Sequence, residues 1–191
     1  GLGVVYKRQF QNPSMGTCPS MTILENMAMA ENKGKAYNLG KGVNKKREEA
    51  YRELLRPLNL GLEDKLHVKV GSLSGGQRQA LTLLMATMVT PKILLLDEHT
   101  AALDPATAKK VLDLTRQIVA ERKITCLMVT HNMHQALELG NRTLMMDSGN
   151  IILDVSGEKR AGMAVEDLLE QFAVCAGKRL DNDRILFSQA E

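Results

Sequence analysis

The chain has 191 residues, enough for one sizeable domain with a buried core, and it is 44% hydrophobic and 25% charged. Its net charge is only +3 and the basic residues are scattered, which argues against a nucleic-acid-binding surface. The 3 cysteines lie far apart, which indicates reduced thiols rather than a disulfide framework or a zinc site, and no apolar run approaches the ~20 residues of a membrane span.

The first half of the chain predicts one short strand followed by helices. Apolar residues 4–6 indicate the strand, and the loop FQNP follows it at 10–13. Three amphipathic or apolar stretches then predict helices, at 21–30 with Thr22 as the cap, at 47–59, and at 74–89. Because residues 14–72 lack strong strand patterns, we expect a helical insert there.

The second half alternates strands with helices. The run KILLLDE, residues 92–98, is aliphatic throughout and ends in two acids, which is typical of a parallel strand buried on both faces. The elements expected after it are a helix at 105–121, a second buried strand at 124–130, a helix at 131–140, a hairpin turning at 148–150, and a tail helix at 163–172. This order predicts an α/β fold with a parallel sheet and right-handed crossovers.

Two glycines stand at the head of the strongest helix, in LSGGQ (73–77), although glycine costs roughly 1 kcal/mol relative to alanine inside a helix. Ser74 is a good N-cap, and a helix N-terminus presents N–H groups and the positive end of the dipole. Gly75 and Gly76 have no side chains to keep an anion away, so a bound phosphate is one interpretation. A tight turn before a core helix is the other, and these residues alone leave both open.

Polar side chains follow each predicted strand at its carboxyl end, where open α/β sheets place their functional sites. Asp97 and Glu98 close the first aliphatic run, His131 closes the second, and Gln11 follows the short strand. One acid would hold Mg²⁺, directly or through water, and the other would polarise a water for attack on phosphorus. The imidazole can donate to a phosphate oxygen. The alternatives are solvated acids at the start of a loop, a structural histidine and an ordinary loop glutamine.

Other polar residues near these strand ends are expected to have structural roles. Asp104 and Pro105 predict a turn and a helix start just beyond the acids. His99 is interpreted as a loop neighbour of the acids, and His134 as a residue on a helix surface.

Five motifs together resemble ATP-binding-cassette ATPases in their order and spacing: FQNP (10–13), LSGGQ (73–77), ILLLDE (93–98), AALDP (101–105) and VTH (129–131). In that order they are similar to the family's Q-loop, signature motif, Walker B strand, D-loop and switch histidine. The resemblance covers essentially the whole chain. It implies a P-loop NTPase-like (RecA-like) α/β fold, in which helices flank a parallel sheet and a helical subdomain is inserted.

The resemblance also implies a role for each residue that matches a motif. Asp97 would support Mg²⁺ through water, as would Gln11, which would also sense nucleotide and touch the transport partner. Glu98 would be the general base, and His131 would steady the γ-phosphate of ATP. Asp104 would communicate across a dimer.

The signature residues would serve ATP held by the other subunit of that dimer, and they are Ser74, Gly75, Gly76 and Gln77. The chain has no P-loop of the form GxxxxGK[ST], and the stretch GKAYNLGKG (34–42) has the wrong spacing and no preceding strand. We therefore expect that the N-terminal P-loop portion is missing from this sequence. The chain as given would then neither bind ATP well in its own site nor hydrolyse it, and its sheet would expose apolar strand faces.

More narrowly, the motif regions look like those of bacterial uptake ATPases that are associated with permeases of the branched-chain amino acid type and with binding proteins for amino acids such as tryptophan. We therefore expect an ATP-hydrolysing importer subunit that uses ATP and Mg²⁺, acts as a homodimer or pseudo-dimer, and lies peripherally on the cytoplasmic face of the membrane under permease subunits. A periplasmic or lipoprotein binding protein would take part indirectly, and no nucleic acid would be bound. The methionine-rich stretch 16–30 could form an adaptable docking surface for a permease, or simply fill the core.

Two alternatives remain at this stage: a cassette protein linked to translation or nucleic acid, and a regulatory subunit without a P-loop. The expected divisions of the chain are the end of the N-terminal core with the Q-loop at 1–13, a helical subdomain with the signature motif at 14–89, a RecA-like core at 90–162, and a helical tail at 163–191.

Overall fold

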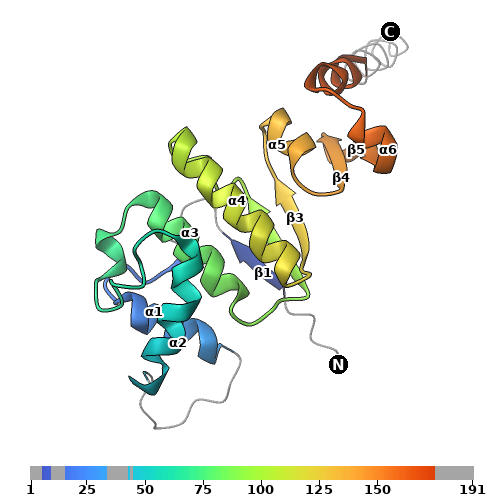
Figure 1. The fold of residues 1–191 in the computed structure, drawn as a ribbon. Helices are drawn as coiled ribbons and strands as arrows, with labels where there is room; N and C mark the ends of the chain where they lie inside the picture. The colour runs from blue at the N-terminus through green and yellow to red at the C-terminus, as the bar shows by residue number, and fades with distance from the viewer. Residues whose placement is uncertain (1–5, 10–15, 34–42, 44, 175–191) are drawn as a thin grey trace, which may run out of the picture. The chain divides into compact units, whose positions relative to one another are not determined.

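The computed structural model describes residues 6–9, 16–33, 43 and 45–174 of the chain (Figure 1). The chain divides into two units, Gly1–Val129 and Thr130–Glu191, and each is described by itself. Gln11 lies outside the described residues, so its predicted role stays a prediction.

Between the first and second strands of the first unit, the described residues form the α-helices α1 (Ile23–Asn32), α2 (Glu48–Leu55) and α3 (Gly75–Thr87). The prediction that Thr22 caps α1 is confirmed, because the Glu25 N–H donates to Thr22 Oγ1 (3.2 Å) while the Thr22 N–H donates to Glu25 Oε2 (2.7 Å). This reciprocal capping box satisfies two N–H groups at the helix start. Short 3-10 turns flank the helices, at Lys45–Arg47, Arg56–Leu58 and Val70–Ser72.

The sheet of the first unit is parallel, in the order β1-β2-β3. Its strands are β1 (Tyr6–Gln9), β2 (Ile93–Asp97) and β3 (Thr125–Val129), and α4 (Pro105–Glu121) connects β2 to β3. This arrangement confirms the predicted parallel α/β sheet. The first strand differs from the prediction, because it extends through the polar residues up to Gln9, whereas it was expected at 4–6.

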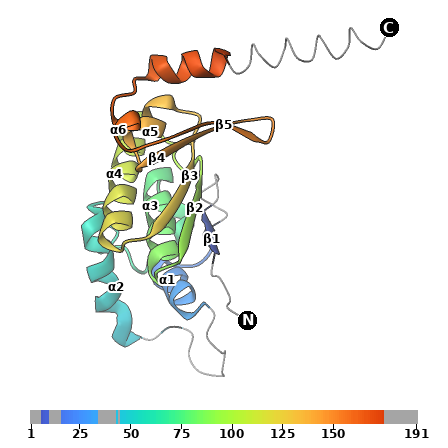
Figure 2. The same ribbon diagram turned by 90° about the vertical axis from the view of Figure 1, so that its right-hand side faces the viewer.

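One face of this sheet carries the core. Leu94 and Leu96 of β2 are buried, and α3 and α4 run along the sheet (Figure 2). The odd-numbered residues of β2 point to the other face and are half-buried. In register with them in β3, Leu127 is 49% exposed and Val129 is 53% exposed. The expectation of exposed apolar strand faces therefore holds in the described residues, whereas burial of both faces does not.

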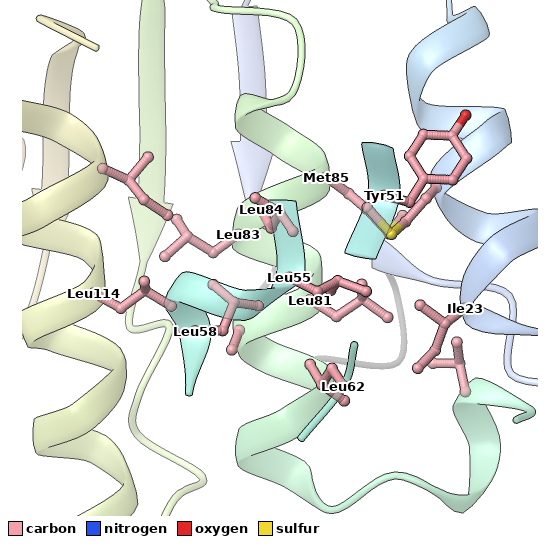
Figure 3. Close-up of a cluster of buried hydrophobic side chains, with 14 of the residues drawn as sticks. Ile23, Tyr51, Leu55, Leu58, Leu62, Leu81, Leu83, Leu84, Met85 and Leu114 are labelled. Atoms are coloured by element: carbon pink, nitrogen blue, oxygen red, sulfur yellow. The ribbon is translucent and has the colours of Figure 1, made fainter. Parts of the chain in front are cut away.

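Helix α3 lies at the centre of the apolar core (Figure 3). Leu81 and Leu83, which point to different sides of the helix, are both fully buried, so α3 is packed on more than one side. Side chains from α1, α2, α4 and the loops between them surround it, among them Ile23, Tyr51, Leu55, Leu58, Leu62 and Leu114. Each such side chain stabilises the fold by about 1.5–3 kcal/mol through burial. This core holds the first residues of α3 in place.

The second unit contains α5 (Met133–Glu138), the antiparallel hairpin of β4 (Arg142–Asp147) and β5 (Asn150–Ser156), and α6 (Gly157–Ala161). The predicted hairpin turn is confirmed, since Ser148 and Gly149 both have positive φ (46° and 81°), as a two-residue turn requires. Residues 165–174 are helical, as the tail prediction expected. The short helix α6 was not predicted.

Arg160 of α6 fixes the end of α5. Its guanidinium donates to the carbonyls of Leu137 (2.6 Å) and Leu139 (2.7 Å) and to Thr143 Oγ1 (2.8 Å). These carbonyls belong to the helix end, where no intrahelical donor is available, so Arg160 acts as a side-chain cap. Of the helices in the described ranges, none combines the length and the apolar character needed to cross a membrane.

Candidate functional site

The N-terminal end of α3, residues 74–77, is called the signature end below. Ser74 is the N-cap: the Gln77 N–H donates to Ser74 Oγ (3.3 Å), and Gln77 Oε1 accepts from the Ser74 N–H (3.1 Å). Gln77 Nε2 also donates to the carbonyl of Leu60 (3.1 Å). The cap uses the N–H of Gln77. The N–H groups of the first helical turn point toward the N-terminal end of α3, where the helix dipole favours an anion.

The two glycines of the signature end have different environments. Gly75 is exposed, and a Cβ there would lie 3.3 Å from Leu103 Cδ2. Gly76 is buried against the start of α4, and a Cβ there would lie 2.0 Å from Thr107 Cγ2. Close packing against Thr107 therefore requires a glycine at position 76. The contact with Thr107 was not predicted, because it depends on how α3 and α4 pack.

The acidic turn, residues 97–101, follows β2 at the carboxyl edge of the sheet. Asp97 is the last residue of the strand, and Glu98 has a left-handed backbone with φ of 44°. The Glu98 N–H donates to the carbonyl of Val129 in β3 (3.0 Å), and the Glu98 carbonyl accepts from the Ala101 N–H (3.0 Å). A non-glycine residue in this conformation costs about 1–3 kcal/mol, and such residues concentrate at functional sites. Both acids thus occupy the strand end that the sequence predicted.

His99, in the same turn, is a core residue and only 3% exposed. Its Nε2 lies 3.2 Å from Thr115 Oγ1 in α4, and the Thr115 hydroxyl donates to the carbonyl of Val111 (2.7 Å). Burial lowers the pKa of His99 to about 4, so the ring is neutral near pH 7. The sequence placed His99 only as a loop neighbour of the acids, because nothing near it in the chain indicates the distant partner.

Asp104 caps α4 as predicted. Its Oδ1 accepts from the Thr107 N–H (3.0 Å), and Pro105 occupies the first helical turn. Hydrogen bonds from Thr107 lower the pKa of the Asp104 carboxyl below its usual value. Because Thr107 also touches Gly76, the structure brings the start of α4 and the signature end side by side.

The described residues offer hard oxygen ligands of the kind that Mg²⁺ takes, in the adjacent carboxylates of Asp97 and Glu98. No group of three or more histidine, cysteine, aspartate or glutamate residues suited to a metal occurs among the described residues. This set fits Mg²⁺, which usually keeps several waters and takes one or two carboxylates together with substrate phosphates. His131 is exposed and belongs to the second unit, whereas Asp97 and Glu98 belong to the first, and His134 is on the surface as expected.

The parallel sheet of the described residues, the helices between β1 and β2 and the capped helix α3 define a P-loop NTPase-like fold of the ABC ATPase type. The structure is similar to MJ1267, an ATP-binding cassette of an ABC transporter solved in its ADP conformation, with a TM-score of 0.67 and 27% identity over 87% of this chain and 67% of that one. A family model described as "ABC transporter" matches residues 4–101, half of the chain. The chain belongs to this family, as an ABC transporter ATP-binding domain.

Relatives with curated descriptions agree with this assignment. The chain is 49% identical over 168 residues to a tyrosine transport ATP-binding protein of Clostridioides difficile, covering 88% of this chain and 66% of that protein. It is 37% identical over 155 residues to the methionine import ATP-binding protein MetN of Clostridium acetobutylicum, covering 74% of this chain and 46% of that protein. The chain therefore spans less than two thirds of the length of these relatives.

Proposed function

We propose that this protein is the ATP-binding and ATP-hydrolysing subunit of a bacterial ABC importer for an amino acid or a related small solute. The observation that carries the proposal is the joint presence, in one unit, of a glycine-headed, capped signature end and of an acid pair at the carboxyl end of β2. The names of two relatives, a tyrosine transport protein and a methionine import protein, support amino-acid uptake.

The acidic turn supplies the hydrolytic chemistry. Asp97 would hold Mg²⁺ through water, and Gln11 would take part in the same way. When bound, that ion would supply positive charge that offsets the charge on the phosphate oxygens of ATP. Glu98 accepts the proton of the water that attacks the γ-phosphorus, and His131 donates to an oxygen of the γ-phosphate.

The signature end acts on ATP held by a second subunit, in a homodimer or pseudo-dimer. The N–H groups of Gly75 and Gly76 and the dipole of α3 meet the γ-phosphate, and Ser74 and Gln77 hold the helix end in shape. Asp104 lies beside this end, through the Thr107 contact, and transmits the state of one site to the other.

The dimer is peripheral and lies on the cytoplasmic face of the membrane, where the helical subdomain docks on permease subunits. The methionines of this region divide between two roles in the structure. Met27 is fully buried in the core, whereas Met29 is 50% exposed and is available to a docking surface. A flexible, polarizable side chain suits such an adaptable contact.

The first test compares ATP hydrolysis by the 191-residue chain with hydrolysis by the protein expressed from its complete gene. We expect activity only in the second, since these 191 residues contain no GxxxxGK[ST] motif. In the active protein, Glu98→Gln should lower kcat by about 100-fold or more, as expected for loss of a general base, while ATP still binds.

Glu166→Gln is the matched control, because it makes the same change at an exposed glutamate far along the chain. It should retain wild-type kcat. Wild-type hydrolysis by the Glu98→Gln variant would remove Glu98 from the role of general base. Failure of permease and binding-protein subunits to copurify, or of reconstituted vesicles to take up amino acids on addition of ATP, would count against an importer.

A further inference from the structure

The backbone of Glu98 needs support from outside its own segment. A left-handed φ of 44° is unfavourable for a residue with a Cβ, and the local chain gains little from it. The main-chain bonds to Val129 and Ala101 fix the peptide groups on either side. Those main-chain bonds do not join the acidic turn to α4. The next residue, His99, is buried and contacts α4.

His99 makes that connection through Thr115. A threonine hydroxyl has a single proton, and Thr115 donates it to the carbonyl of Val111 at 2.7 Å. Thr115 Oγ1 therefore accepts from His99, which places the ring proton on Nε2 across the 3.2 Å contact. Both side chains are nearly inaccessible, with 3% and 6% exposure, so water does not compete for this hydrogen bond.

We propose that His99 is a positioning residue for Glu98: its buried ring, hydrogen-bonded to Thr115, fastens the acidic turn to α4 and thereby sets where the Glu98 carboxylate points. The inference rests on the proposed function, in which Glu98 is the general base. Because α4 also begins at the Asp104 cap, the same tether fixes the base relative to the dimer-facing end of that helix.

The test measures kcat and KM for ATP in the protein expressed from its complete gene. Thr115→Val removes the acceptor with little change of volume, and we expect kcat to fall roughly tenfold at unchanged KM, because a general base that is misplaced by a fraction of an ångström loses rate but not substrate binding. His99→Leu removes the donor and should lower kcat by up to about 100-fold, as a displacement approaching 1 Å would. Thr115→Ser and His99→Gln keep a hydroxyl acceptor and an amide donor at the position of Nε2, and both should restore most of kcat.

Thr87→Val is the matched control. Thr87, like Thr115, is a buried helical threonine, and its hydroxyl donates to the carbonyls of Leu83 and Leu84 (3.0 Å each) without a histidine partner. It should retain wild-type kcat, so that a loss in Thr115→Val reports the tether rather than the general cost of removing a buried hydroxyl.

Each outcome bears on one of the two proposals. Three outcomes would overturn the tether: wild-type kcat in folded Thr115→Val and His99→Leu, an equal loss of kcat in Thr87→Val, or no rescue by Thr115→Ser. If Glu98→Gln is inactive, each of these outcomes still leaves Glu98 as the general base. Wild-type hydrolysis by Glu98→Gln would overturn the proposed base itself. A fall in kcat at constant KM that the conservative pair of variants rescues supports the role of His99.

Discussion

The signature end of α3 and the acidic turn after β2 bring functional groups into place by different means. The cap of the signature end is made by its own chain neighbours, through the reciprocal bonds of Ser74 and Gln77, and Gln77 adds a bond to a more distant residue, Leu60. The acidic turn is held by other elements, through Val129 of β3 and Thr115 of α4. The first arrangement is local and the second depends on tertiary packing.

This difference follows from what each region has to present. An anion site at a helix start needs only main-chain N–H groups, which any capped helix already aims in one direction. A general base needs one carboxylate at one place, and here that place requires a left-handed backbone at Glu98. A conformation that is unfavourable by itself persists only where the surrounding structure determines it.

The largest effect on stability is expected at Gly76, because this residue of the signature end packs against a distant segment, the start of α4. An alanine Cβ there would meet Thr107 Cγ2 at 2.0 Å, so either the methyl group or the helix must move. We expect Gly76→Ala to lower the free energy of unfolding by about 1–3 kcal/mol, as overpacking does, measured by urea denaturation.

Gly75→Ala is the matched control, since its Cβ would meet only the flexible end of Leu103 at 3.3 Å. Its free energy of unfolding should stay within about 0.5 kcal/mol of wild type. The double variant Gly76→Ala, Thr107→Ser removes the opposing methyl group and should recover most of the loss. If Gly76→Ala is as stable as wild type, the close packing of α3 on α4 is wrong.

The parts of the fold that were predicted from sequence are those that local physics determines. The caps at Thr22, Ser74 and Asp104, the aliphatic strand β2 and the turn at Ser148 each depend on side chains within a few residues. The identity of the acids followed from their place after a strand, because a parallel sheet brings strand ends to one edge.

The parts that were missed depend on contacts between distant segments. The burial of His99 requires Thr115 on a helix that comes later in the chain, and the constraint on Gly76 requires Thr107. The left-handed backbone of Glu98 has no sequence signal either, because glutamate is not a residue that favours it. The roles of Gln11 and His131 stay predictions, because Gln11 lies outside the described residues and His131 belongs to the second unit.

A smaller effect on stability is expected at Ser74, where comparison with Thr22 separates the role of Ser74 as a helix cap from its role in binding a ligand. Ser74→Ala and Thr22→Ala remove the acceptor of two similar capping boxes, at the starts of α3 and α1. Each should lower the free energy of unfolding by about 1 kcal/mol, measured by urea denaturation. Only Ser74→Ala should weaken ATP-driven dimerisation, measured by light scattering with the Glu98→Gln background to prevent hydrolysis. Equal weakening by both variants would show that the signature end contributes stability alone.

The smallest effect is expected at Asp104, where asparagine can replace the cap but not its charge. Asparagine and aspartate are equally good N-caps, so Asp104→Asn should leave the melting temperature at pH 7 nearly unchanged.

The folded-state pKa of Asp104 is lowered by the Thr107 hydrogen bonds, so its contribution to stability is complete above the ordinary value of 3.8 and is lost as the pH falls below it. Relative to Asp104→Asn, the wild type should therefore lose stability only as the pH falls below about 3.8, which thermal denaturation at a series of pH values from about 5 down to about 2 measures. Asp113→Asn, an exposed aspartate on the same helix, removes the same charge without touching the cap and should show no such crossover. A pH-independent difference between Asp104→Asn and wild type would mean that the carboxylate does not accept the Thr107 bond in solution, and a loss of ATP turnover at unchanged stability would assign the charge to communication between subunits.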